Sequence, residues 1–470
     1  MTTASEYGAP NEDAELHDRD DEQVEWQLDA IDVRLVERCL LSAAVAGVEL
    51  GAPSSTDFEE SYLDTEDWRL YRAGYVLRVH SSGTGAEARL EVTGETGGPT
   101  HAFVEPLPAP DPAGITESHG SVGERVRLLA AGRALRPLFD LRTARRTYTL
   151  QVEGEPAGLL RLDETVVALP DGEPVRLHRV TVTVPEAASA RVRGLVEECR
   201  LQPATVSTFE AGLLARSLSP TAFPDLGPVD IDGSLCLGEV AFAVLRRHFG
   251  VLLRKEAGVR LGEDPEELHD MRVATRRLRA AMRLFSDALP GEASELRDEL
   301  GWLGRTLGDV RDLDVQLGQF HEWLEETSPE HREELAALGS VLVERREQAR
   351  ERMLSALNSQ RYDRLVSAYT SMLQRGPDPS APAAPRPILA VGPDLIERRF
   401  RKVRKAGEGI TPASSPDEYH RLRIEGKKLR YALEFLTNVY GGPAKALVRP
   451  LVELQDLLGT HQDTHVAMDH

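Results

Sequence analysis

The residues of this sequence most suited to chemistry form a stripe of positive charge in HDMRVATRRLRAAMRLF, residues 269–285. Wound as an α-helix, the segment gathers these side chains within an arc of about 80°: His269, Arg272, Arg276, Arg279 and Arg283. Like charges at this spacing repel one another, so the stripe favours an anionic partner. One arginine guanidinium can donate two hydrogen bonds to two phosphate oxygens at once. A phosphate-rich anion is therefore the partner that the chemistry predicts.

A second segment, HRLRIEGKKLRYALEFL at residues 420–436, repeats the first at an offset of 151 residues, called the repeat offset below. Its cations again share one side of the helix: His420, Arg423, Lys427 and Arg430, with Glu434 in place of the last arginine. The same offset carries LGDVRDLDV onto LGTHQDTHV, and carries Arg247, Phe249 and Arg254 onto Arg398, Phe400 and Lys405. Three separated blocks at one offset indicate a tandem duplication with approximate two-fold symmetry.

The opposite side of each helix is apolar, which predicts that this side packs against the rest of a helical domain. In the first copy it consists of Met271, Ala274, Leu278, Ala281, Met282 and Phe285, and in the second of Leu422, Leu429, Ala432, Leu433 and Leu436. The two basic stripes are then expected to converge into one positive cleft. The cleft has no interleaved aromatic residues for base stacking, so polyphosphate is favoured over a nucleic-acid backbone. The competing interpretation is an ordinary charged face with cross-helix ion pairs, whose histidines hold a neighbouring helix.

The chain is predicted to be an α+β protein of two domains. Segments such as YVLRVHSS, ARLEVTGE and RLHRVTVTV alternate apolar and polar residues, which predicts an antiparallel sheet or barrel with a few helices over residues 22–217. Residues 1–21 are expected to form a disordered acidic tail, and the proline- and glycine-rich residues 218–234 a linker. A helical period follows over 235–470, in which a proline-rich break at 375–387 separates repeat one, 235–374, from repeat two, 388–470.

Composition excludes several classes of protein. The formal net charge of −21 argues against a protein that coats nucleic acid. No apolar run approaches the roughly 20 residues of a membrane-spanning helix, and the first residues do not read as a secretory signal. Cys39, Cys199 and Cys236 lie far apart, so neither a zinc site nor a disulfide framework is expected. We expect a cytoplasmic protein, with polyphosphate granules as a further expected location.

The C-terminal motifs resemble the CHAD family, the conserved-histidine α-helical domain, over about Leu235 to His470. The resemblance implies two pseudo-symmetric helical bundles that bind inorganic polyphosphate in a central basic groove. The binding residues that it implies are His269, Arg272, Arg276, Arg277 and Arg279, with His420, Arg423, Lys427, Lys428 and Arg430; Arg247, Arg254, Arg398 and Lys405 are weaker candidates. The second repeat stops five residues after His465, so its final helices are expected to be missing.

The N-terminal domain resembles the CYTH family, the triphosphate tunnel fold, through YLDTEDWRLYRAGYVLRV and LRLDETVV. In that family a first strand reading E-x-E-x-K supplies carboxylates for metal ions and a lysine for the triphosphate. Here the strand reads QVEWQLDA, where Glu25 keeps a carboxylate but Gln23 and Gln27 do not, and Thr181 and Thr183 occupy the later carboxylate positions. Two-metal phosphoryl transfer needs several carboxylates, so we expect a degenerate tunnel without a metal site.

The preferred function is therefore a polyphosphate-binding protein that requires no cofactor and whose CYTH-like domain is non-catalytic. The alternative is an inorganic triphosphatase that uses Mg²⁺ or Mn²⁺ through Glu25 and that the helical domain targets to polyphosphate. A third hypothesis is a scaffold in which Asp and Glu residues of facing helices neutralise the basic stripes.

Overall fold

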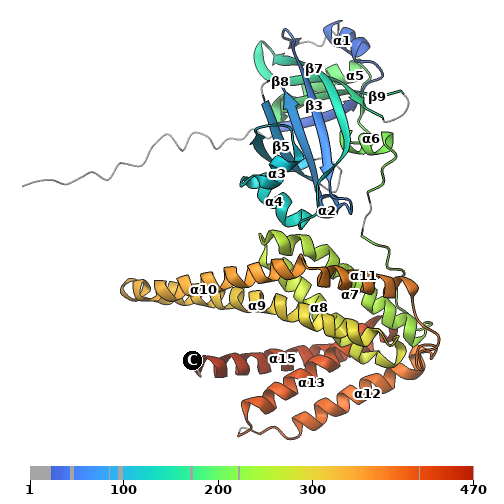
Figure 1. Ribbon diagram of the computed structural model, residues 1–470, viewed down its shortest axis with the longest axis vertical. Helices are drawn as coiled ribbons and strands as arrows, with labels where there is room; N and C mark the ends of the chain where they lie inside the picture. Colours follow the sequence, from blue (N-terminus) through green and yellow to red (C-terminus); the bar gives the residue numbers. More distant parts are fainter. Residues whose placement is uncertain are drawn as a thin grey trace, which may run out of the picture. The chain divides into compact units, whose positions relative to one another are not determined.

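The computed structural model in Figure 1 describes residues 23–42, 47–83, 85–93, 99–169, 173–220, 223–411 and 413–468. The chain divides into two compact units, Met1–Thr221 and Ala222–His470. The tail expected at residues 1–21 lies outside the described residues. None of the helices in the described ranges combines the length and the apolar character that crossing a membrane requires.

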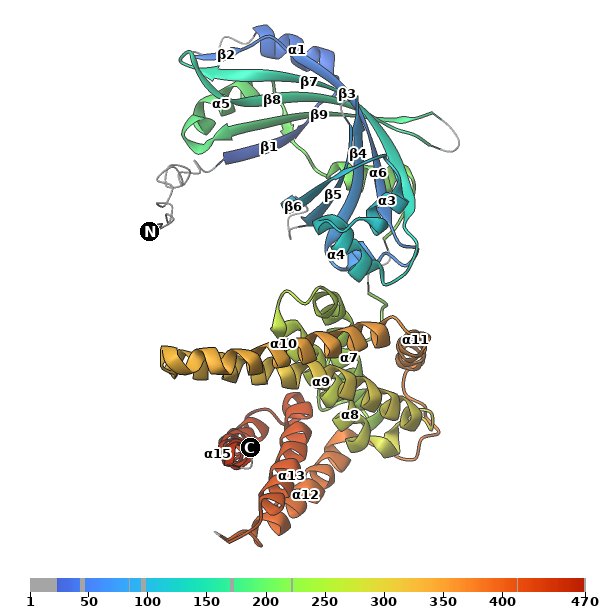
Figure 2. The same cartoon turned by 60° about the vertical axis from the view of Figure 1, so that its left-hand side comes forward.

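The first unit is built on an antiparallel sheet, as the alternating sequence predicts. Its ten described strands are β1 (Gln23–Asp29), β2 (Val48–Leu50), β3 (Ser54–Asp64), β4 (Tyr75–Ser82), β5 (Gly85–Thr93), β6 (Pro99–Leu107), β7 (Arg136–Val152), β8 (Glu155–Val167), β9 (Val175–Pro185) and β10 (Gln202–Pro203). They pair in the order β10-β1-β9-β8-β7-β3-β4-β5-β6, with β2 on β7. Figure 2 shows the sheet strongly bent, but the pairing of the described strands does not close into a ring. A closed barrel or tunnel therefore stays a prediction.

Strand alternation gives the sheet of the first unit two chemically different faces. One face packs Leu28 of β1 and the apolar residues of β7 to β9 against helices α1 (Val33–Ser42) and α5 (Glu186–Glu198). Glu25 and Gln27 lie on the opposite face, where they pair in register with Thr183 and Thr181 of β9. This opposite face is called the polar face below. The remaining helices are α2 (Arg69–Arg72), α3 (Pro112–Glu117), α4 (Ser121–Ala130) and α6 (Thr208–Ala215).

The second unit is helical and repeats itself. Its first half contains α7 (Leu237–Leu261), α8 (Pro265–Leu284), the 3-10 helix η2 (Ser286–Ala288), α9 (Ala293–Glu326), α10 (Pro329–Leu357) and α11 (Gln360–Arg375). Its second half contains α12 (Ile388–Gly407), α13 (Pro416–Phe435), α14 (Thr437–Tyr440) and α15 (Gly442–Met468). The two ends of α13 follow the two ends of α8 by the repeat offset, and the start of α12 follows the start of α7 by the same offset. The duplication that the sequence predicts is thus a duplication of helices.

Helices α8 and α13 begin with the same local chemistry. Asp264 accepts a hydrogen bond from the backbone N–H of Glu266 and Pro265 occupies the first turn of α8. Ser415 forms a reciprocal capping box with Glu418 ahead of Pro416 in α13. Such caps satisfy backbone donors that no helical carbonyl reaches, and each stabilises a helix by about 1 kcal/mol. The caps fix where each basic stripe starts.

The apolar face predicted for both helices is confirmed. Every residue predicted to lie on it is buried, including Met271 and Leu278 in α8 and Leu429 and Leu433 in α13. Burial of each large apolar side chain contributes roughly 1.5–3 kcal/mol before entropy costs. This burial orients the basic stripe of each helix away from the core.

Candidate anion-binding site

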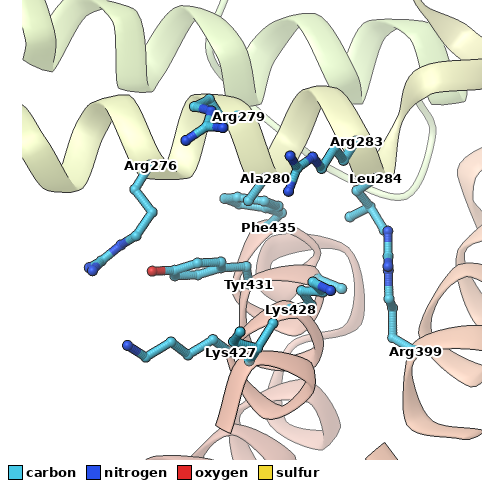
Figure 3. A pocket seen from close by; sticks show the side chains of 12 residues that line it. Arg276, Arg279, Ala280, Arg283, Leu284, Arg399, Lys427, Lys428, Tyr431 and Phe435 are labelled. Carbon is cyan, nitrogen blue, oxygen red and sulfur yellow. The ribbon is translucent and has the colours of Figure 1, made fainter. Parts of the chain in front are cut away.

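A cavity of about 410 Å³ lies between α8 and α13, and Figure 3 shows the side chains that line it. Six of the lining residues are cationic: Arg276, Arg279, Arg283, Arg399, Lys427 and Lys428. The others are Ala280, Leu284, Ile424, Tyr431, Ala432 and Phe435, so no acidic side chain lines it among the residues that the structure describes. The two basic stripes do converge, as the sequence predicts.

The cavity walls follow the internal duplication. Three pairs of residues related by the repeat offset line the cavity, namely Arg276 with Lys427, Ala280 with Tyr431, and Leu284 with Phe435. Helices α8 and α13 also contact each other directly. Equivalent residues therefore face one space from both repeats, as approximate two-fold symmetry requires.

Positive charge in the cavity is concentrated enough to shift the pKa of one of its lysines. Burial, together with the charges of Arg423, Arg276, Arg430 and Arg272, lowers the pKa of Lys427 to about 8. Burial, followed by the charges of Arg283 and Arg305, likewise lowers the pKa of Arg279. These shifts mean that the folded protein places cations near one another at a free-energy cost. A bound anion would remove that cost.

Most of the cavity cations have no neutralising partner. No ion pair joins Arg276, Arg279, Arg283, Arg399 or Lys427 to any carboxylate of the described residues. Lys428 is different, because its Nζ lies 2.6 Å from a carboxylate oxygen of Glu425. The five unpaired cations are thus the ones available to a ligand.

A second set of arginines on α8 and α13 is held by carboxylates beside the cavity. Arg277 donates to Glu434 across the two helices at 2.9 Å, and Arg430 lies 3.5 Å from the same carboxylate. Arg272 pairs with Asp312 of α9 at 2.9 Å, so this carboxylate ties α8 to α9. Some arginines of each stripe are therefore neutralised by carboxylates, as the scaffold hypothesis predicts. Most cations that line the cavity are not neutralised in this way.

One arginine of each repeat lies beside a glycine of a neighbouring helix, at a distance where an added Cβ would make only an ordinary contact. A Cβ built on Gly308 of α9 would lie 3.5 Å from Nη2 of Arg272, and one built on Gly459 of α15 would lie 3.7 Å from Nη2 of Arg423. Arg272 and Arg423 are related by the repeat offset, as are the two glycines. The two arginines therefore lie in equivalent places in both repeats.

Beside the main cavity lies a hollow of about 260 Å³, which shares Arg283, Leu284 and Arg399 with it. The rest of its lining comes from α12 and from η2: Leu395, Arg398, Arg401 and Lys402, with Ser286 and Asp287. This hollow therefore adds three cations, Arg398, Arg401 and Lys402, and the carboxylate of Asp287 to the charged groups of the main cavity. The two hollows together form a basic groove that runs from α13 past α8 to α12.

Comparison with protein-family models matches residues 243–470 to the CHAD domain. Residues 243–470 form a CHAD domain. This finding agrees with the duplicated helices and the basic cavity between them.

Several solved structures are similar to this chain. The CHAD domain from the plant Ricinus communis is 29% identical, with a TM-score of 0.44 over 53% of this chain and 82% of that chain. PptA from Streptomyces chartreusis is 20% identical, with a TM-score of 0.40 over 49% of this chain and 84% of that chain. A putative adenylyl cyclase from Hippeastrum, described as having a dominant triphosphatase activity, is 17% identical, with a TM-score of 0.32 over 43% of this chain and 100% of that chain. No match was found among curated proteins.

Several predicted binding residues of the CHAD domain do not line the cavity. His269 is half-buried and His420 is exposed, and neither lines either hollow. Arg247 donates to the backbone carbonyl of Val229 at 3.1 Å. Arg254 and Lys405 are exposed and also lie outside the two linings. Their role in binding stays a prediction, whereas Arg398 lies in the smaller hollow.

The structure adds Tyr431 and Arg399 to the candidate site and corrects one expectation. The cleft does contain aromatic residues, because Tyr431 and Phe435 line it. Tyr431 lies four residues after Lys427 and therefore on the same side of the helix. This spacing could have identified Tyr431 as a site residue from the sequence alone. The counterpart of Arg399 in repeat one is His248, whose pKa falls to about 4 because of burial and the charges of Arg277 and Arg247.

The polar face of the N-terminal sheet also carries arginines, and carboxylates neutralise two of them, Arg78 and Arg145, whereas Arg161 donates to the hydroxyl of Thr183. Arg78 lies between Glu60, at 2.6 Å, and Glu91, at 2.5 Å. Arg145 makes two hydrogen bonds of 2.7 Å to Asp163. Burial would raise the pKa of Glu60, but the hydrogen bond from His80 and the charges of Arg78 and Arg145 keep it below the usual value.

Arg146, by contrast, pairs with Glu37 of α1 on the opposite face of the sheet. Glu25 on the polar face accepts hydrogen bonds from Gln27 and Thr183 at 3.2 and 3.4 Å. Within the part of the chain that the structure describes, no group of three His, Cys, Asp or Glu residues is arranged to hold a metal ion.

Proposed function

We propose that this protein binds inorganic polyphosphate in the basic groove between α8, α13 and α12. The observation that carries the proposal is the set of five unpaired cations that line one cavity: Arg276, Arg279, Arg283, Arg399 and Lys427. The depressed pKa of Lys427 supports it, because burial and then the charges of neighbouring arginines disfavour the charged lysine. A ligand with a dense row of negative oxygens would compensate that charge.

The shape and lining of the groove favour polyphosphate over a nucleic acid. Sequence-independent binding of single strands uses exposed aromatic rings on which bases stack. Tyr431 is only 4% exposed, and Phe435 is 5% exposed, so neither offers a free ring face of that kind. The groove instead presents guanidinium and ammonium groups, which suit a ligand made of phosphate alone.

The N-terminal sheet domain takes a non-catalytic part in this proposal. Arg78 and Arg145 of its polar face are occupied by Glu60, Glu91 and Asp163, and Arg161 is hydrogen-bonded to Thr183. Glu25 has threonine and glutamine neighbours where a two-metal site needs further carboxylates. Binding of polyphosphate would then need no metal ion or other cofactor, and we propose a cytoplasmic location for it.

A titration of the full chain with long-chain inorganic polyphosphate at two salt concentrations tests the proposal. By analogy with counterion release from nucleic acids, affinity should fall by about 1,000-fold between roughly 50 and 200 mM salt. The affinity should change little when a chelator removes divalent metal ions. Absence of binding at the lower salt concentration would overturn the proposed function.

A further inference from the structure

One polar group in the cavity is buried, has no hydrogen-bond partner and is not a cation. The side chain of Tyr431 is among the buried residues of α13, and its hydroxyl makes no hydrogen bond to any residue that the structure describes. Figure 3 shows the ring between the side chains of Arg276 and Lys427, with the hydroxyl directed to the side on which those two side chains extend. A buried hydroxyl without an acceptor is unfavourable, so this position requires an explanation.

The surroundings of Tyr431 are rich in cations, and the nearby carboxylate of Glu434 binds two of them rather than the hydroxyl. The guanidinium carbons of Arg276, Arg277 and Arg430 lie 6.0, 5.7 and 5.6 Å from the centre of its ring. Guanidinium and ammonium groups donate hydrogen bonds and cannot accept them. The remaining side chains in the lining are apolar, so no acceptor for the hydroxyl lines the cavity among the described residues. Because the unpaired cations Arg276 and Lys427 flank the ring, an anionic acceptor in the cavity is favoured over a neutral one.

The geometry around the ring is fixed before any ligand arrives. Phe435 stacks on Tyr431 with ring centres 6.1 Å apart and an angle of 19° between the planes. Glu434 holds both Arg277 and Arg430 close to the ring. The Nε atom of Arg277 is buried and makes no hydrogen bond to the described residues, whereas the Nε atom of Arg430 faces Glu434 at 3.5 Å. Several donors of fixed position thus lie around one region of the cavity.

The same position in repeat one has no such donor. Ala280, which precedes Tyr431 by the repeat offset, also lines the cavity but presents only a methyl group. The cations Arg276 and Lys427 face the cavity from both walls and are related by the duplication, whereas the hydroxyl belongs to one wall. It can therefore fix one phosphate group of a uniform chain at a defined place in the groove.

We infer that the hydroxyl of Tyr431 donates a hydrogen bond to a phosphate oxygen of the bound chain and positions that phosphate in the cavity. This inference rests on the proposed function. A hydrogen bond from a neutral group releases no counterion, so its contribution should not depend on salt. The arginines and Lys427 should supply the salt-dependent part of the affinity.

The test is Tyr431→Phe in the full chain, titrated with long-chain inorganic polyphosphate at low and moderate salt. We expect affinity to fall about tenfold at both concentrations, with the slope of log affinity against log salt unchanged. Tyr369→Phe is the matched control, because its hydroxyl is also buried without a described hydrogen-bond partner but packs against Phe249 in the core and does not line the cavity. The control should bind as the wild type does.

The possible outcomes separate this inference from the proposed function. If the wild type does not bind at low salt, the proposed function fails. If the wild type and Tyr431→Phe bind equally, the function stands and the inference is overturned. A loss that vanishes at the higher salt would also overturn it, because the contact would then be electrostatic. Thermal unfolding without ligand should show both variants at least as stable as the wild type, which excludes a folding defect as the cause.

Discussion

The polar face of the N-terminal sheet and the cavity of the CHAD domain both contain clustered arginines, yet they differ in what surrounds those arginines. On the sheet, Arg78 lies between two carboxylates and Arg145 makes a bidentate pair with Asp163. In the cavity, Arg276, Arg279, Arg283 and Arg399 have no ion-pair partner among the described residues. Arg78 and Arg145 are thus neutralised on the sheet, whereas the four arginines of the cavity make no ion pair with the described residues.

The difference indicates that an anion-binding site is marked by cations that lack an ion-pair partner, rather than by the number of arginines. A buried arginine held by two carboxylates would have to lose those contacts before it could bind a phosphate, which costs several kcal/mol. A cation that its neighbours repel gains free energy when an anion arrives. The unpaired cations that line the cavity make it the second kind of site, and the pKa of Lys427, lowered by burial and by neighbouring arginines, agrees with this.

The largest expected effect is the loss of binding when cavity charges are reversed. Arg276→Glu combined with Arg283→Glu should weaken polyphosphate binding by about 1,000-fold or more, because two exposed cations of the groove become repulsive. Isothermal titration measures the affinity and thermal unfolding measures the stability. The stability of the free protein should be kept, since neither arginine has an ion pair to lose among the described residues.

The matched control for this experiment is Arg345→Glu with Arg352→Glu. Both residues are exposed on α10 and neither lines the groove, so the net charge changes equally. Equal losses in both double variants would contradict a local site. Unfolding of the cavity variant would instead favour the scaffold hypothesis.

The next largest effect concerns stability on the sheet. Arg78→Leu leaves Glu60 and Glu91 without their shared cation, and the free energy of unfolding should fall by about 3 kcal/mol. Arg142→Leu breaks an exposed pair with Glu59 and should cost less than about 1 kcal/mol. Urea denaturation followed by circular dichroism gives both values. Weakened polyphosphate binding by Arg78→Leu at unchanged stability would place the anion site on the sheet.

A smaller effect should follow from the titration of Lys427. Its pKa is about 8 in the free protein, and a bound anion should raise it towards the usual lysine value. Below pH 8 the lysine is charged in both states and contributes no pH dependence. Above pH 8 binding must take up a proton, so affinity should fall by up to about tenfold between pH 8 and pH 9.

Affinity measured at pH 7, 8 and 9 for the wild type and for Lys427→Arg checks this prediction. The arginine stays charged throughout, so its affinity should be flat over the same range. An equal fall in both proteins would show that some other group is responsible.

The smallest expected effect is that of Glu25→Ala. Glu25 is exposed and makes hydrogen bonds only with Gln27 and Thr183 among the residues described, so its removal should change neither stability nor polyphosphate binding measurably. Release of phosphate from inorganic triphosphate with Mg²⁺ or Mn²⁺ should stay at the background rate in both proteins. A metal-dependent rate in the wild type that Glu25→Ala abolishes would establish the triphosphatase alternative.

Much of the scaffold could be predicted because its signals are local and periodic. The repeat offset relates both ends of α8 to those of α13, and the helical period anticipates which of their residues are buried. The strand period likewise places Glu25 and Gln27 on one face of β1. Both kinds of pattern depend only on neighbours along the chain.

The site itself was only partly predictable, because it depends on how separate helices meet. Arg399 enters the cavity through the position of α12, and no pattern within that helix distinguishes it from Arg398 or Arg401. Which arginines are neutralised follows from contacts such as Arg277 with Glu434, 157 residues apart. The role proposed for Tyr431 rests on an unmet hydrogen bond, which a sequence does not display.

The most direct test of the central claim is a crystal structure of the protein soaked with short-chain inorganic polyphosphate. The account predicts density for consecutive phosphate groups between α8 and α13, within hydrogen-bond distance of Arg276, Lys427 and the Tyr431 hydroxyl. Phosphate density on the polar face of the sheet, with the cavity between α8 and α13 left to solvent, would contradict it.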